Sequence, residues 1–170
     1  YTPPRTSHIQ YLKSIAMNIA LGTNGANVQI TEGDAHLTLT DTSVSVDGYD
    51  MSFAWEYERR GIFVETRTSH EHALYIITID SKTLIYLPTG TTVDDLEALR
   101  DVNNKDLVIF PASETLWKTV ETWEASVVVP YGSGAKTLMN KLAQTVEPTA
   151  SVNIKPSDLE SETTRFVLLG

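Results

Sequence analysis

Hydrophobic and polar residues alternate in several short stretches of this chain, which is the pattern of β-strands with one buried face. Two pairs of such stretches flank turn-forming residues, Glu32-Gly33-Asp34 in the first pair and Asp80-Ser81-Lys82 in the second. Each pair therefore predicts a β-hairpin. The strands predicted from alternation and from short apolar runs cover residues 28–30, 37–39, 44–46, 51–57, 73–79, 83–87, 107–110 and 127–129.

Apolar residues at helical spacing predict helices between and before these strands. Thr92 is followed three residues later by Asp95, which is the spacing of a capping box, and Leu96 and Leu99 supply a buried stripe. A helix is therefore expected directly after Thr92. The other predicted helices cover residues 7–22, 113–124 and 135–145.

The composition changes at Pro148 toward Thr, Ser, Glu and Pro, which favours a mobile linker or arm over residues 148–164. The chain then ends in the apolar residues 166–169. This terminal segment is expected to pair with a sheet edge, either in its own chain or in a partner.

Together these elements predict an α+β fold with a mixed or antiparallel sheet that is flanked by helices. We expect three parts along the chain. Residues 1–101 form the α+β core, residues 102–147 form a βαβα extension packed on that core, and residues 148–170 form a polar arm with a terminal apolar strand.

The composition narrows the possible functions. The chain of 170 residues contains no cysteine, which excludes a disulfide framework, a thiolate nucleophile and a cysteine-ligated metal site. Its formal net charge of -9 argues against sequence-independent binding to nucleic acid. No apolar run reaches the ~18 residues that a membrane span needs, so a soluble protein is expected. We therefore expect a protein partner or self-association, with nucleic acid disfavoured and no membrane contact.

One part of the chain resembles a known family. Residues 56–61 read Glu-Tyr-Glu-Arg-Arg-Gly, and they are followed by Thr68, by residues 73–75 (Ala-Leu-Tyr) and by residues 85–89 (Ile-Tyr-Leu-Pro-Thr). Over roughly residues 9–101 this order is similar to the small phage-encoded nucleases of the PD-(D/E)XK type. The resemblance implies a restriction-endonuclease-like core with a C-terminal α/β extension. It also implies a phage or viral protein, located in the cytoplasm of an infected host cell or in a virion.

The catalytic residues of that family are missing from their expected place. The family uses an Asp on one strand and an acid-x-Lys on the next to hold Mg²⁺ and to orient the attacking water. Here the acid-x-Lys position reads Leu37-Thr38-Leu39, only Asp41 matches, and the position of the first Asp falls near Val28. The resemblance therefore implies a pseudo-nuclease without a cofactor, which acts by protein–protein binding or assembly.

Two other functions stay open at this level. The first is a Mg²⁺-dependent nuclease whose acids have moved to Asp41, Glu56 and Glu58, with Lys82 as the charged helper. The simpler interpretation of Glu56 and Glu58 is a solvated outer face of a strand. The second is an acidic inhibitor or DNA mimic that acts on a host enzyme.

Three basic and three aromatic residues are candidates for contact with a partner. The basic ones are the densest basic group in the middle of the chain, although local pairing with Glu58 and Glu65 is the simpler expectation. The aromatic ones are candidates because large aromatic residues are enriched at interfaces. The six residues are Arg59, Arg60, Arg67, Trp117, Trp123 and Phe166.

Three further motifs have a simpler structural interpretation. His70-Glu71-His72 has a spacing that a metal could use, but a surface loop is expected there. Residues 127–138 resemble a phosphate-binding loop but place Pro130 and Ala135 where such a loop needs glycine, so a connecting loop is expected. Asp80-Ser81-Lys82 has the acid-x-Lys spacing, but its composition favours a turn.

Overall fold

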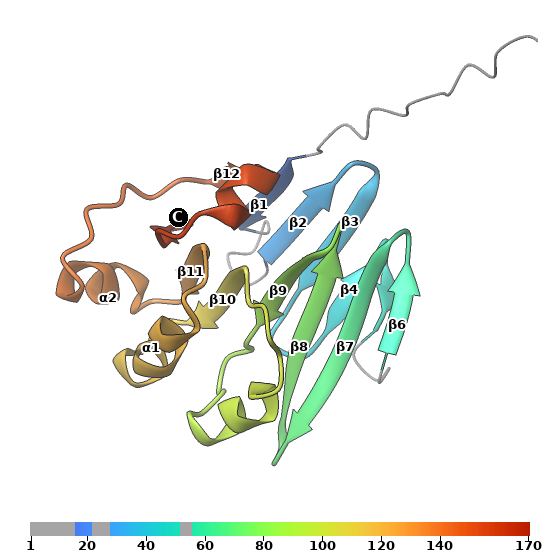
Figure 1. Ribbon diagram of the computed structural model, residues 1–170, viewed down its shortest axis with the longest axis horizontal. Coiled ribbons are helices and arrows are strands. Elements are labelled where there is room, and N and C mark those ends of the chain that lie inside the picture. The colour runs from blue at the N-terminus through green and yellow to red at the C-terminus, as the bar shows by residue number, and fades with distance from the viewer. Residues whose placement is uncertain (1–15, 22–27, 52–55) are drawn as a thin grey trace, which may run out of the picture.

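Two β-sheets pack face to face, and a layer of short helices covers one of them (Figure 1). The computed structural model describes residues 16–21, 28–51 and 56–170. The six-stranded sheet has the order β12-β1-β2-β3-β4-β5, and all its neighbouring strands are antiparallel. Its strands are β1 Met17–Leu21, β2 Val28–Glu32, β3 Ala35–Leu39, β4 Val44–Val46, β5 Tyr49–Asp50 and β12 Ser151–Ile154.

The seven-stranded sheet has the order β13-β11-β10-β9-β8-β7-β6. Strands β6 to β9 form an antiparallel meander, whereas β9, β10, β11 and β13 run parallel to one another. Its strands are β6 Glu56–Arg59, β7 Ile62–Ser69, β8 His72–Ile79, β9 Lys82–Tyr86, β10 Leu107–Pro111, β11 Val127–Tyr131 and β13 Arg165–Phe166. The helical segments are η1 Asp94–Leu99, α1 Glu114–Val120, η2 Glu121–Trp123, α2 Ala135–Lys141 and η3 Pro156–Glu160.

The burial of each strand follows from its place in these layers. In the six-stranded sheet the buried positions alternate, and residues such as Ile19 and Leu37 pack against the second sheet. Strand β10 is buried on both faces, because Val108 packs under the helices while Ile109 faces the other sheet. This double burial explains the continuous apolar runs of β10 and β11, which contrast with the alternation of the six-stranded sheet.

The predicted hairpins are confirmed. β2 and β3 pair antiparallel from Val28 opposite Leu39 down to the turn before Ala35. β8 and β9 pair in the same way, with a two-residue turn at Asp80 and Ser81 whose φ angles are 47° and 65°. Two positive φ values in a two-residue loop give a turn whose twist suits a hairpin.

The helix predicted over residues 7–22 is wrong for its described part. Met17–Leu21 is strand β1, which pairs with β2 on one side and with β12 on the other. The buried residues Met17 and Ile19 alternate with Asn18, and this spacing of two places them on one face of a strand but on different faces of a helix. Residues 7–15 lie outside the described residues.

The predicted α+β architecture, with a sheet flanked by helices, is also wrong. Strands β1 to β5 and β12 form a separate antiparallel sheet that packs on one face of the second sheet, and the helices lie on the other face. The boundary expected at residue 101 falls between β9 and β10, which are hydrogen-bonded neighbours in one sheet. The strands of the first fifty residues therefore build most of a second sheet, which the predicted architecture did not contain.

Residues 148–170 differ from the linker that their composition favours. β12 adds an edge to the six-stranded sheet beside β1 (Figure 1), and β13 adds an edge to the seven-stranded sheet beside β11. Ile154, Leu159, Val167 and Leu168 are buried. These four apolar residues of the polar segment thus enter the core. The terminal apolar segment pairs within its own chain.

No helix among the described ranges 16–21, 28–51 and 56–170 is both long enough and apolar enough to cross a membrane.

Candidate functional site

The structure separates the residues that a relocated nuclease site would need. Glu56 and Glu58 lie on β6 of the seven-stranded sheet, whereas Asp41 lies in the turn after β3 of the other sheet. The hydroxyl of Thr89, which follows β9, donates to Asp41 Oδ1 at 2.7 Å, while Lys82 begins β9. Asp41 and Lys82 therefore lie near opposite ends of that strand, and Lys82 is paired with an acid of η3.

Metal-ligand side chains do not gather in the described part of the chain. Among residues 16–21, 28–51 and 56–170, no group of three or more His, Cys, Asp or Glu side chains could hold a metal ion. Leu37 and Leu39, at the expected acid-x-Lys position, are fully buried between the two sheets. Their apolar character follows from this packing.

The three arginines are engaged within the chain. Arg60 Nε lies 2.8 Å from Asp47 Oδ2, and the guanidinium of Arg59 stacks 3.8 Å above the ring of Tyr49. Arg67 pairs with Glu65 and with Asp101 after η1, and its Nη1 also donates to a backbone oxygen near that helix. The expected local pairing thus holds for Arg67 and Glu65, whereas Arg59 and Arg60 are held by the β4–β5 turn instead.

The outer face of β6, β7 and β8 carries an open groove of about 500 Å³, here called the acidic groove. The helices leave this end of the sheet uncovered, and Figure 1 shows β6 at the far end of the sheet from α1 and α2. The outward side chains come from alternate positions of the three strands. The groove is lined by Glu56, Tyr57, Glu58, Phe63, Val64, Glu65, Ile76 and Thr78.

Strand register places two carboxylates directly opposite each other in the acidic groove. Glu56 stands opposite Glu65 across β6 and β7, and Glu58 stands opposite Phe63. Glu65 is paired with Arg67, but Glu56 has no ion-pair partner in the described part of the chain. Like charges at directly opposed positions destabilise a sheet. The groove therefore combines an excess of negative charge with the exposed ring of Phe63, of which 54% is accessible to solvent.

Sequence reasoning found only part of this groove. It paired Glu56 with Glu58 because alternate strand residues share a face. It did not single out Phe63 or Ile76, whose positions depend on the register of the hairpins. The signal was available at Arg60-Gly61, because a two-residue turn there fixes Glu58 opposite Phe63.

The carboxyl ends of the parallel strands, where open sheets commonly bind ligands, are occupied here by internal hydrogen bonds. The hydroxyl of Tyr86 donates to Thr40 O at 2.9 Å, and that of Tyr131 donates to Leu87 O at 2.7 Å. Burial raises the pKa of both phenols, that of Tyr131 to about 12. Both phenols therefore stay protonated at neutral pH and act as structural links at this edge.

A second polar centre joins the β7–β8 turn to η1. Asp95 is fully buried, and its Oδ2 accepts from the backbone N–H of Thr92 at 2.8 Å and lies 2.7 Å from His72 Nδ1. His70 Nδ1 lies 3.5 Å from Oδ1. Burial alone would raise the pKa of Asp95, but the hydrogen bonds from Thr92 and His72 outweigh it and lower this pKa to about 2. Only half of the predicted capping box is therefore present. Asp95 accepts from the backbone N–H and the hydroxyl of Thr92, but η1 begins after Val93 without a side-chain cap.

The variant Asp95→Asn is expected to lose less of its free energy of unfolding on acidification than the unmodified protein does. The lowered pKa means that the carboxylate stabilises the folded state above its ordinary pKa of 3.8, and that this contribution disappears as the pH falls through about 2. The pKa difference corresponds to about 2 kcal/mol. Urea unfolding of both proteins between about pH 4 and about pH 2 measures it. If the free energy of unfolding fell equally with pH in both proteins, the lowered pKa of Asp95 would be contradicted.

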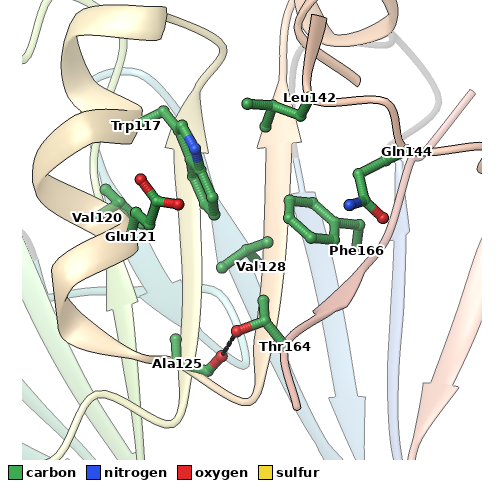
Figure 2. A pocket seen from close by; sticks show the side chains of 9 residues that line it. All are labelled: Trp117, Val120, Glu121, Ala125, Val128, Leu142, Gln144, Thr164 and Phe166. Atoms are coloured by element: carbon green, nitrogen blue, oxygen red, sulfur yellow. Dashed lines mark hydrogen bonds between the residues drawn. The ribbon is translucent and has the colours of Figure 1, made fainter. Parts of the chain in front are cut away.

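The aromatic candidates divide into two groups. Trp117 and Phe166 meet with their ring centroids 5.4 Å apart, and both line the pocket in Figure 2. Trp123 is half-buried elsewhere, with Lys105 Nζ 5.0 Å from its ring centroid. The structure therefore joins two of the three aromatic candidates at one pocket.

Comparison with known proteins identifies the architecture. No protein-family model matches the chain, and no curated protein matches its sequence. A solved structure from Thermotoga maritima, provisionally described as a Zn-dependent hydrolase of the metallo-β-lactamase superfamily, has a TM-score of 0.55 and 8% sequence identity. The match covers 90% of this chain and 98% of that one.

This similarity corrects the resemblance to PD-(D/E)XK nucleases, and the phage or viral origin inferred from it has no support. The residues that carried the resemblance lie on β6 to β9, in the turn after β6 and directly after β9, and alternation and turn residues recur in any antiparallel meander. A restriction-endonuclease-like core is likewise replaced by the two sheets described above. The chain has a metallo-β-lactamase-like fold.

Proposed function

We propose that this protein is a binding module that holds a basic, partly apolar segment of a partner protein in the acidic groove. The single observation that carries the proposal is the facing pair Glu56 and Glu65 beside the uncovered ring of Phe63. The zinc chemistry named for the structural neighbour is not carried over, because the described residues form no group of three or more His, Cys, Asp or Glu side chains that could hold a metal ion.

The acidic groove lowers the stability of the isolated protein. Two opposed carboxylates repel each other, and Phe63 leaves a large apolar surface in water. A partner that brings a cation between the carboxylates and an apolar side chain onto the ring removes both costs. An arginine suits the first position, because its planar guanidinium can bond two carboxylates at once.

The register also defines the spacing of the partner residues. Glu56 and Glu65 form one cross-strand row, and Glu58 and Phe63 form a row two residues further along β6. Side chains two apart in an extended peptide are separated by about 7 Å and point the same way. The groove therefore suits an extended Arg-x-Leu segment, with arginine at the carboxylate pair and leucine on Phe63.

A labelled peptide of repeated Arg-Thr-Leu-Thr is expected to bind, and Glu56→Gln with Glu65→Gln should weaken it by about tenfold or more. The physical reason is the loss of both acceptors for the guanidinium. Fluorescence anisotropy at low and moderate salt measures the affinity, which should fall as salt rises. A peptide with glutamate in place of arginine should not bind.

The matched control is Glu147→Gln with Glu162→Gln, which removes the same charge from exposed positions outside the groove. This control should bind the peptide within about twofold of the unmodified protein. Glu56→Lys serves as a fold control, because it replaces the repulsion by an attraction and should unfold no more easily than the unmodified protein. Equal weakening in the groove and control variants would overturn the proposal, and so would no weakening in either.

A further inference from the structure

We infer that the pocket in Figure 2 binds a small organic cation with an aromatic or branched apolar body. The pocket lies between α1, β11 and β13, at the opposite end of the seven-stranded sheet from the acidic groove. We call it the Trp117 pocket. The inference stands apart from the proposed function, because no residue lines both the pocket and the groove.

One part of the Trp117 pocket is apolar and adjoins its polar residues. Val128 of β11 forms the floor, and the rings of Trp117 and Phe166 form walls inclined by 51° to each other. Figure 2 shows Leu142 above these rings. This apolar part can hold the aromatic or branched aliphatic body of a ligand whose other end is polar.

The volume of the pocket decides the size of that group. The cavity measures about 260 Å³. An apolar cavity of about 150 Å³ is enough for benzene. The Trp117 pocket therefore has room for one six-membered ring and a short side chain.

The rim of the pocket carries a negative electrostatic potential. Glu121 is the only ionisable residue among those that line it, and this carboxylate has no ion-pair partner in the described part of the chain. It also caps the C-terminal end of α1, where backbone carbonyls add negative potential. Aromatic faces attract cations as well. An ammonium group on a ring-bearing ligand satisfies all three features.

Two polar residues complete the assignment of the ligand. The side-chain amide of Gln144 lies across the pocket from Glu121 in Figure 2 and can accept from an ammonium group. The hydroxyl of Thr164 already donates to Ala125 O at 2.8 Å. Thr164 therefore closes the base of the pocket, while Glu121 and Gln144 orient the cationic end of the ligand.

The probe for this site is 2-phenylethylammonium, compared with the anion 3-phenylpropionate and the neutral 2-phenylethanol. Isothermal titration should show binding of the cation with a Kd near or below about 1 mM, and weaker binding of the other two. Glu121→Gln should weaken binding of the cation by about fivefold or more and leave the affinity for 2-phenylethanol unchanged. Glu124→Gln removes an exposed acid close in sequence that does not line the pocket, and it should change neither affinity.

A second variant tests the cavity itself by filling it. Leu142→Trp places a larger side chain in the pocket from a half-buried lining position and should abolish binding of all three compounds. Absence of binding by 2-phenylethylammonium would overturn the inference. So would equal affinity for the cation and the anion, or binding that survives Leu142→Trp. Glu56→Gln with Glu65→Gln should leave the titration unchanged, so failure here is distinguishable from failure of the acidic groove.

Discussion

A chain that stops at residue 148 is expected to lose its cooperative fold. The missing segment contains β12, η3 and β13, and it buries Ile154, Leu159, Val167 and Leu168. Full burial of one such side chain contributes about 1.5–3 kcal/mol, so the four contribute roughly 6–12 kcal/mol. That sum is comparable to the entire stability of an ordinary domain, about 5–15 kcal/mol. The truncation also leaves β1 and β11 as open edges, which favour aggregation.

Circular dichroism and urea unfolding of the truncated and full chains measure this effect. The full chain should unfold in one sharp transition, and the truncated chain should show none. The matched control replaces Ser157 and Glu162, two exposed residues of the same segment, with alanine and should change little. A truncated chain with a native spectrum and a sharp transition would show that residues 149–170 are the dispensable arm that their composition favours.

Phe110→Ala is expected to lower the free energy of unfolding by about 3–5 kcal/mol. Phe110 lies on β10 and is completely buried beneath the helices, and its ring centroid is 6.1 Å from that of Trp117. Truncation at this position leaves a cavity that strands and helices on both sides prevent from closing. The variant thus measures how firmly the helix layer is packed on the seven-stranded sheet.

Phe63→Ala is the matched control, because it makes the same chemical change on an uncovered part of the same sheet. Phe63 keeps 54% of its surface in water, so the loss should be below about 1 kcal/mol. Chemical denaturation of both variants gives the comparison. The account requires that the helices cover β10 and leave β7 open. Equal losses of unfolding free energy in the two variants would contradict it. Phe63→Ala should also weaken the Arg-Thr-Leu-Thr peptide, because the leucine loses its contact.

Local pattern was sufficient for those elements whose partners lie nearby in sequence. The β2–β3 and β8–β9 hairpins follow from alternation around a short turn, and the runs at β10 and β11 follow from burial on both faces. The pairing of β1 with β12 could not be predicted in this way. It joins Asn18 to Asn153, and a five-residue strand carries too few apolar positions to reveal its period.

The candidate sites show the same division. Glu56 and Glu58 share a face by strand geometry alone, so the sequence places them together. The opposition of Glu56 and Glu65 requires the register of a hairpin, and the contact of Trp117 with Phe166 requires a parallel pairing of β11 with the end of the chain. Long-range pairing is what creates both the acidic groove and the Trp117 pocket, and no local pattern encodes it.

The most direct test of the acidic groove is a map of the backbone amides that respond when the Arg-Thr-Leu-Thr peptide is added to isotope-labelled protein. Shift changes in nuclear magnetic resonance spectra are expected on three outward-facing segments, Glu56–Glu58, Phe63–Glu65 and Ile76–Thr78. The amides of α1, β11 and β13 should stay unchanged. Shift changes confined to α1, β11 and β13, or no change anywhere, would contradict the proposal that the open end of the seven-stranded sheet is the binding face.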